Sequence, residues 1–134
     1  DGSALERFRA MIEAQGGDPR VVDDPVGVLP RAPVVMSIEA DRAGTLARMA
    51  TEDIGLASGA LGAGRMRKGD PIDPSVGIVV RCKIGDRLDV GEPIGEVHAR
   101  DDDDAREAAR RVLDALVMRE GTVQPPPLVH TWLE

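Results

Sequence analysis

Aromatic residues are scarce in this sequence, which has no tyrosine, one phenylalanine (Phe8) and one tryptophan (Trp132). Proteins that bind single strands of nucleic acid stack the bases on aromatic side chains, so this chain lacks that platform. The formal net charge of −7 points the same way, because nucleic-acid and anionic-membrane surfaces need clustered Lys and Arg. We therefore expect neither a nucleic acid nor a membrane as a partner.

Cysteine is limited to Cys82, so neither an intrachain disulfide nor a cysteine-based zinc site can form. This usage suits a reducing cytoplasm. No apolar run approaches the roughly 20 residues of a membrane span, and no signal peptide is visible. A chain of 134 residues fits one domain with an aliphatic core. Because it begins with Asp1 and not Met, we expect a piece of a longer protein.

The first predicted element is a helix from Ser3 to about Gln15. Ser3 and Glu6 have the spacing of a capping box. The apolar residues that follow fall on one helical face, namely Leu5, Phe8, Met11 and Ile12. The Gln15-Gly16-Gly17-Asp18-Pro19 turn stops this helix, and the proline-rich segment up to Pro33 is predicted to be a linker.

Two strands and a second helix are predicted next. Residues 34–40 are rich in β-branched side chains, and the turn 41–44 leads into a strand that ends near Met49, so the pair is expected to form a hairpin. Thr51 can cap the following helix, whose first turn holds Glu52 and Asp53. Apolar residues keep the helical spacing as far as Gly62.

The segment 76–82 is almost continuously apolar, which is typical of a strand covered on both faces, and we expect it to be the central strand. Short strands are predicted around Leu88 and over residues 94–99. Tight turns at Gly85-Asp86 and Gly91-Glu92 bracket the first of them.

The clearest helical pattern in the sequence follows Asp101–Asp104. These acidic residues are interpreted as a helix cap and not as a cation site. The apolar stripe of this helix should pack on a sheet and comprises Ala105, Ala108, Ala109, Val112, Leu113, Leu116 and Val117. After a Pro125–Pro127 spacer, residues 128–133 alternate as a closing edge strand would.

A loop rich in glycine and positive charge joins the second helix to the apolar strand. Gly59 and Gly64 have the spacing of the glycines of a phosphate-binding P-loop. Arg65 and Met66 nevertheless stand where that motif has lysine and a hydroxyl residue, and this loop is predicted to follow a helix, not a strand. The pattern therefore favours a structural turn with an exposed basic edge.

His98 and His130 have no cysteine partners and no common motif spacing, so the sequence predicts no metal site. A strand-end histidine with a local hydrogen bond is the simpler interpretation. Cys82 lies inside an apolar run and is expected to be a buried small hydrophobe, not a nucleophile.

The spacing Gly85-Asp86-x-Leu88-x-x-Gly91-Glu92-x-Ile94 is shared with biotinyl and lipoyl carrier domains. Those domains present a lysine at a hairpin tip, usually between methionines, and Met66-Arg67-Lys68 is a partial match. A biotinyl- or lipoyl-like carrier, or a non-catalytic interaction domain, is therefore an alternative function.

Taken together, the turn at residues 15–19, the loop at residues 59–77 and the segment at residues 85–92 resemble the C-terminal domain of thymidine and pyrimidine-nucleoside phosphorylases. The resemblance runs from Asp1 to about Glu134. It implies an α+β fold of the α/β-hammerhead type, a small sheet with helices related to the biotinyl/lipoyl barrel-sandwich hairpin. Residues 1–33 would then be the end of the mixed α/β domain with a linker, and residues 34–134 the C-terminal domain.

The resemblance also implies a function for the parent chain. Such enzymes are cytoplasmic transferases (glycosyltransferases) of pyrimidine-nucleoside metabolism and salvage, and each moves a pentose from the nucleoside to phosphate, giving free base and sugar 1-phosphate. They use no cofactor and are expected to be homodimers. Their phosphate and nucleoside sites belong to the helical and mixed α/β domains, so we expect no catalytic residue here.

In the parent enzyme, the loop from Gly62 to Gly69 is expected to serve domain closure over a cleft that holds phosphate. The residues assigned to this role are Gly62, Gly64, Arg65 and Lys68. An alternative is that Arg65 pairs with Asp70 or Asp73 inside its own loop.

Overall fold

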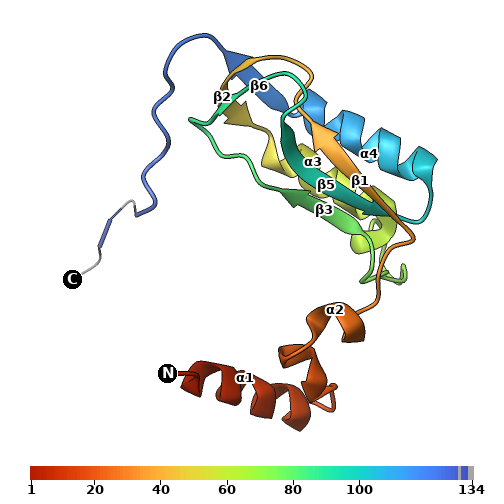
Figure 1. The fold of residues 1–134 in the computed structure, drawn as a ribbon. Helices are drawn as coiled ribbons and strands as arrows, with labels where there is room; N and C mark the ends of the chain where they lie inside the picture. The colour runs from red at the N-terminus through yellow and green to blue at the C-terminus, as the bar shows by residue number, and fades with distance from the viewer. Residues whose placement is uncertain (130, 133–134) are drawn as a thin grey trace. The chain divides into compact units, whose positions relative to one another are not determined.

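The computed structural model describes residues 1–129, 131 and 132. The chain divides into two compact units, residues 1–31 and residues 32–134. The second unit combines helices with two small antiparallel sheets, which confirms the predicted α+β class (Figure 1). Among the described residues, no helix has the length and apolar character needed to cross a membrane.

The first unit begins with α1 (Ser3–Ala14), close to the predicted helix. The predicted capping box is wrong, because Ser3 is the first helical residue and Gly2 is the N-cap. The Asp1 carboxylate takes over the capping and accepts hydrogen bonds from the Ser3 amide at 2.9 Å and the Ser3 hydroxyl at 2.7 Å. The predicted apolar face of α1 is largely open within this unit, and Leu5, Phe8 and Met11 are each about half exposed.

Two short helical turns occupy the segment predicted as a linker, η1 (Pro19–Val22) and α2 (Pro25–Val28). Each begins at an aspartate whose side chain accepts a backbone N–H, with Asp18 bonded to Arg20 and Asp24 to Gly27. Both have proline in the first turn, where the missing N–H costs nothing. Arg9 of α1 donates two hydrogen bonds of 2.9 Å to Asp23, so α1 and η1 form one unit.

Two three-stranded sheets form the second unit. The first has the order β1-β5-β3, built from β1 (Val34–Glu39), β5 (Pro93–Ala99) and β3 (Gly77–Val80). The second has the order β4-β2-β6, built from β4 (Arg87–Leu88), β2 (Gly44–Met49) and β6 (Leu116–Arg119). All four pairings are antiparallel.

The predicted hairpin between β1 and β2 is wrong, although both strands were placed correctly. β1 pairs with β5, whereas β2 pairs with β4 and β6, so the connection between β1 and β2 crosses from one sheet to the other. At this crossing, the Ala40 amide donates to the Glu92 carbonyl and the Gly91 amide donates to the Ala40 carbonyl, each at 2.9 Å. The Ala40 backbone groups, which a hairpin between β1 and β2 would need, are thus bonded to the turn before β5.

The predicted central strand is also wrong. β3 lies at the edge of its sheet, and β5 is the central strand with β1 on one side and β3 on the other. Val79 of β3 is 41% exposed, so this strand is not covered on both faces. Gly95 of β5 contributes to this arrangement of strands, because a Cβ at position 95 would collide with the Val79 carbonyl oxygen. A strand with glycine there lets β3 approach closely.

The turns around β4 were predicted correctly. The Asp86 amide donates to the Lys83 carbonyl and the Glu92 amide to the Asp89 carbonyl, and Gly85 and Gly91 have the left-handed φ values of 100° and 81°. β4 and β5 nevertheless belong to different sheets, so the turns do not close a hairpin between these strands.

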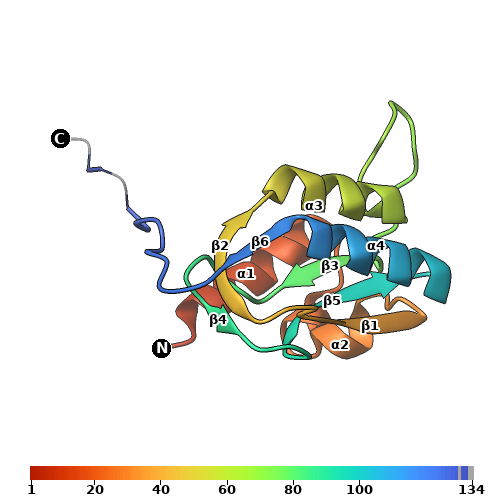
Figure 2. The same cartoon turned by 90° about the horizontal axis from the view of Figure 1, so that it is seen from above.

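Three helical elements complete the second unit: α3 (Thr51–Ser58), the π-helical turn η2 (Gly59–Ala63) and α4 (Asp102–Asp114). The predicted Thr51 cap is wrong, because Thr51 is already helical and Ala50 is the N-cap without a side-chain bond. Glu52 and Asp53 occupy the first turn, as predicted. α3 and α4 lie side by side, and α4 packs on β1 and β5 (Figure 2).

The end of α4 differs from the sequence prediction. Asp101 caps the helix as expected, accepting the amides of Asp103 and Asp104. The helix ends at Asp114, however, and Leu116 and Val117 belong to β6, a strand that the sequence analysis missed. The Ala50 amide donates to the Ala115 carbonyl at 2.9 Å, which draws the chain into register with β2.

Residues 120–129, 131 and 132 contain no helix or strand, so the described part of the predicted closing edge strand is irregular. Leu128 and Trp132 are largely exposed. Leu133, also assigned to that strand, lies outside the described residues.

A single core joins both sheets to α4. Its most deeply buried members are Ile38, Leu46, Ile94, Val97, Ala99, Ala105 and Val112, each at most 1% exposed. All core residues belong to the second unit, which therefore buries its own apolar surface.

We predict that Leu46→Ala lowers the free energy of unfolding by about 2–5 kcal/mol, because Leu46 is completely buried in β2 and its loss leaves a cavity. Chemical denaturation of both proteins measures this. Leu56→Ala is the matched control, since Leu56 is 50% exposed on α3 and should cost less than about 0.5 kcal/mol. Equal effects of the two changes would contradict the described core.

Candidate functional site

A loop leaves the helical layer at Gly62 and returns at Asp73, shortly before β3. Gly62 interrupts η2 with a non-helical, left-handed φ of 102° that glycine adopts without steric cost. The Asp73 amide donates to the Gly62 carbonyl at 2.9 Å and so closes the loop. We call residues 63–72 the cationic loop, because they include Arg65, Arg67 and Lys68.

The tip of the cationic loop is a turn from Arg67 to Asp70. The Asp70 amide donates to the Arg67 carbonyl at 3.2 Å, and the Asp70 carboxylate accepts the Arg67 amide at 2.7 Å. Gly69 supplies the positive φ of 96° that the turn needs. Arg65 Nε donates to the Asp70 carbonyl at 3.3 Å, so the Arg65 side chain folds across the turn. Local hydrogen bonds thus give the tip a defined shape.

The three cations of this loop are exposed, and within the described part of the chain no carboxylate neutralises their charge. No ion pair joins Arg65, Arg67 or Lys68 to a described carboxylate. The alternative that Arg65 pairs with Asp70 or Asp73 inside its own loop holds in part, because Arg65 Nε bonds the Asp70 carbonyl, whereas the Asp70 carboxylate bonds the Arg67 amide and Asp73 bonds other groups. An exposed cluster of free cations suits an anionic ligand or surface.

Asp73 fastens the base of the loop. Its Oδ1 accepts hydrogen bonds from the Ser75 hydroxyl at 2.6 Å and the Ser75 amide at 3.0 Å, and its Oδ2 accepts one from Arg100 Nε at 3.0 Å. The two Ser75 bonds and then the Arg100 guanidinium lower the pKa of Asp73 to about 2. The Arg100 guanidinium also lies against Gly62, where a Cβ would come within 2.7 Å of Nη2. We call Gly62, Asp73, Ser75 and Arg100 the neck.

The register between β3 and β5 brings the neck residues together. Gly77 pairs with His98, so the chain two residues before Gly77 lies level with the chain two residues after His98. These positions are Ser75 and Arg100. Residues far apart in sequence therefore meet, because β3 begins and β5 ends at the same end of the sheet.

Of the predicted loop residues, Gly62 lies in the neck, whereas Gly64, Arg65 and Lys68 lie in the cationic loop. Gly64 has an extended backbone, and a Cβ there would make only ordinary contacts, so its conformation does not require glycine. The loop follows helical structure and not a strand, which confirms the prediction against a P-loop. Sequence analysis missed Arg100, and no local pattern marks its bond to Asp73.

The two remaining sequence candidates have structural roles. Cys82 is 4% exposed, and burial raises the pKa of its thiol, as expected for a small hydrophobe and not a nucleophile. His98 Nε2 lies 3.6 Å from Glu96 Oε2, so it makes an ion-pair contact when protonated but no hydrogen bond. Among the described residues, no group of His, Cys, Asp and Glu could hold a metal ion. His130 lies outside them.

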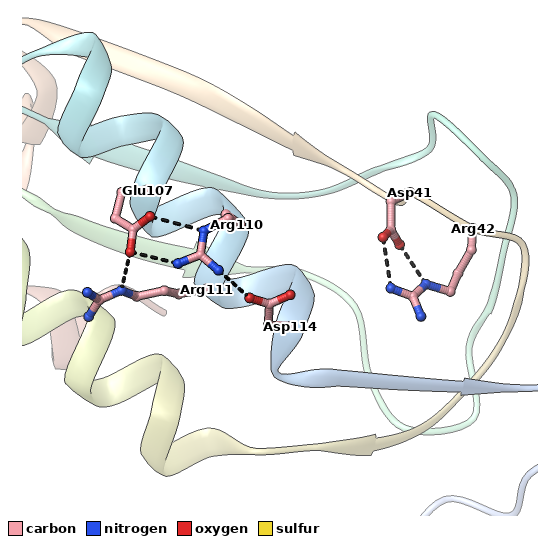
Figure 3. Close-up of polar contacts among 6 residues, drawn as sticks. All are labelled: Asp41, Arg42, Glu107, Arg110, Arg111 and Asp114. Atoms are coloured by element: carbon pink, nitrogen blue, oxygen red, sulfur yellow. Dashed lines mark hydrogen bonds and ion pairs between the residues drawn. The ribbon is translucent and has the colours of Figure 1, made fainter.

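A groove of about 280 Å³ between α3 and α4 is one alternative to the cationic loop. The two arginines that line it are bonded to carboxylates of their own helix: Arg110 and Arg111 donate to Glu107, and Arg110 also donates to Asp114 (Figure 3). These arginines lower the pKa of Glu107 to about 2. Because these opposite charges neutralise one another, the groove offers less unpaired charge to a ligand than the cationic loop does.

Comparison with known proteins assigns a family to this arrangement. Residues 45–119 match the family model described as "Pyrimidine nucleoside phosphorylase C-terminal domain". The chain is 41% identical over 127 residues to a thymidine phosphorylase of Burkholderia cenocepacia, an alignment that covers 95% of this chain and 29% of that protein. It is 37% identical over 131 residues to a pyrimidine-nucleoside phosphorylase of Bacillus subtilis, covering 98% of this chain and 30% of that protein.

A pyrimidine-nucleoside phosphorylase of Staphylococcus aureus is 40% identical over 131 residues, which cover 96% of this chain and 29% of that protein. The chain thus spans less than a third of the length of the curated relatives it matches. The family match covers every strand of the two sheets except β1, and also α3, the cationic loop, the neck and α4, although the first residue of β2 precedes it. The chain belongs to the pyrimidine nucleoside phosphorylase C-terminal domain family.

Proposed function

We propose that this chain is the C-terminal part of a pyrimidine-nucleoside phosphorylase. The whole enzyme would transfer a pentose from a pyrimidine nucleoside such as thymidine to phosphate, giving free base and sugar 1-phosphate. Family membership and the names of the relatives support this proposal. Such an enzyme acts in pyrimidine-nucleoside salvage as a glycosyltransferase, in the cytoplasm and as a homodimer.

The proposal assigns residues 1–33 to the end of the mixed α/β domain with its linker, and residues 34–134 to the C-terminal α+β domain. The division of the chain after Arg31 supports this boundary, as does the family match, which lies wholly within the second unit. The partners of this part are then the helical and mixed α/β domains of the same enzyme.

Within the enzyme, Gly62, Gly64, Arg65 and Lys68 would form a closure loop that meets the phosphate-holding cleft. The observation that supports this role is the exposed, uncommitted positive charge on a loop with a fixed base. Pentosyl transfer passes through an oxocarbenium-like centre with an anionic nucleophile, so cations that arrive on closure would act mainly in the transition state.

The carrier alternative rests on Lys68, which occupies the exposed turn at the loop tip. Against it, this turn joins η2 to β3 and does not join two paired strands. The structural context of a carrier lysine is therefore missing around Lys68.

We predict that the 134-residue chain alone has no phosphorolytic activity, because it spans less than a third of its relatives' length and the phosphate and nucleoside sites are expected in the other domains. Thymidine incubated with phosphate and the purified chain should release no thymine above the buffer rate. Turnover that survives repurification would contradict the domain assignment.

We predict that Arg65→Ala in the full-length enzyme lowers kcat/KM by about tenfold or more, since a lost charge-assisted contact in the transition state costs roughly 1.5–3 kcal/mol. Steady-state kinetics and Tm are measured together. Arg119→Ala is the control, because Arg119 is an exposed arginine in β6, outside the loop. Unchanged kcat/KM for Arg65→Ala would refute the closure role.

We also predict that Lys68 and Lys83 stay unmodified in a host with active biotin and lipoate ligases. Intact mass of the purified protein decides this. A stoichiometric adduct on either lysine would establish the carrier alternative.

A further inference from the structure

We propose that Asp73 and Arg100 are positioning residues for the cationic loop, and that their ion pair fixes the direction in which Arg65, Arg67 and Lys68 are presented. The effect on turnover rests on the proposed function, but the effect on the loop itself does not.

The first argument is the way the neck bonds meet at one side chain. Asp73 joins the returning end of the loop to Ser75 through Oδ1 and to Arg100 through Oδ2, while its amide bonds the Gly62 carbonyl at the departing end. One residue thus ties both ends of the loop and the segment between β5 and α4. Loss of its charge would weaken the bond to Arg100 and so release the loop from the segment between β5 and α4.

The second argument is the packing of Arg100 on Gly62. A Cβ at position 62 would lie 2.7 Å from Arg100 Nη2, so a side chain there would displace the guanidinium from its present place. Arg100 is followed directly by the N-cap Asp101, and it follows the buried Ala99. It is therefore anchored on both sides, and the loop is fastened to a rigid part of the fold.

The third argument concerns the bonds that hold the rest of the cationic loop. Beyond Asp73, the cationic loop is held by bonds within itself, namely those among Arg65, Arg67 and Asp70. These bonds shape the tip but do not orient it relative to the sheets. Among the described hydrogen bonds and ion pairs, the neck alone performs that task, so the loop should move as one piece when the neck opens.

The test uses limited trypsin digestion of the 134-residue chain, with cleavage after Arg65, Arg67 and Lys68 followed by mass spectrometry. Core residues lie only within residues 32–134, which supports the use of this chain by itself, and Tm is recorded for each variant. Asp73→Asn keeps the shape of the side chain but removes its charge. We expect about fivefold faster cleavage in the loop. The cleavage rate follows the fraction of molecules in which the loop is open, and loss of an exposed ion pair should raise that fraction by about this factor.

Asp41→Asn is the matched control, because Asp41 forms an exposed ion pair of 2.9 Å with Arg42 on the connection between β1 and β2 (Figure 3). It removes the same charge and should leave cleavage in the loop unchanged. Arg100→Gln should reproduce the effect of Asp73→Asn, and the double variant should add nothing to either, because both changes break one link. Arg100→Lys should restore part of the protection.

Two outcomes would overturn the proposal: cleavage in the loop that stays at the wild-type rate in Asp73→Asn, or a rise that Asp41→Asn matches. Kinetics of Asp73→Asn in the full-length enzyme then separate the two claims. Faster cleavage together with about fivefold lower kcat/KM supports both. Faster cleavage with unchanged kcat/KM supports the positioning role and refutes the catalytic role of the loop.

Discussion

Burial of β5 is the interaction on which the second unit depends. β5 is paired along both edges, with β1 and β3, α4 packs against it, and its residues Ile94, Val97 and Ala99 are each at most 1% exposed. Each fully buried aliphatic side chain of this kind stabilises the fold by about 1.5–3 kcal/mol. Because the partners of β5 come from residues 34–39, 77–80 and 102–114, its burial ties together most of the chain length.

The same strand also determines where the candidate site lies. The antiparallel register of β5 with β3 brings Arg100 beside Ser75 and Asp73, and this contact fixes the base of the cationic loop. The loop is therefore positioned by the sheet even though its own residues make few bonds to it. The loop thus combines a base held by Asp73 and Arg100 with exposed cations at its tip.

Charge is used in two ways in this acidic chain. On α4, Glu107, Arg110, Arg111 and Asp114 neutralise one another at exposed positions, where such pairs stabilise the helix only slightly. In the cationic loop, the nearby carboxylate of Asp70 bonds a backbone amide, and among the described residues the arginine and lysine side chains form no ion pair with it. Positive charge is thus available at the loop despite a net charge of −7.

The sequence by itself determined the local elements, because their signals lie within a few residues of one another. The apolar stripe and Asp101 cap of α4, the turns at Gly85 and Gly91 and the helix end at Gly62 are all of this kind. Only the tertiary structure decided which strands pair, because pairing depends on contacts between distant segments. It made β5 and not β3 central, separated β1 from β2, and moved Leu116 and Val117 from the helix to β6. It also joined Asp73 to Arg100, a contact across 27 residues that no local pattern could indicate.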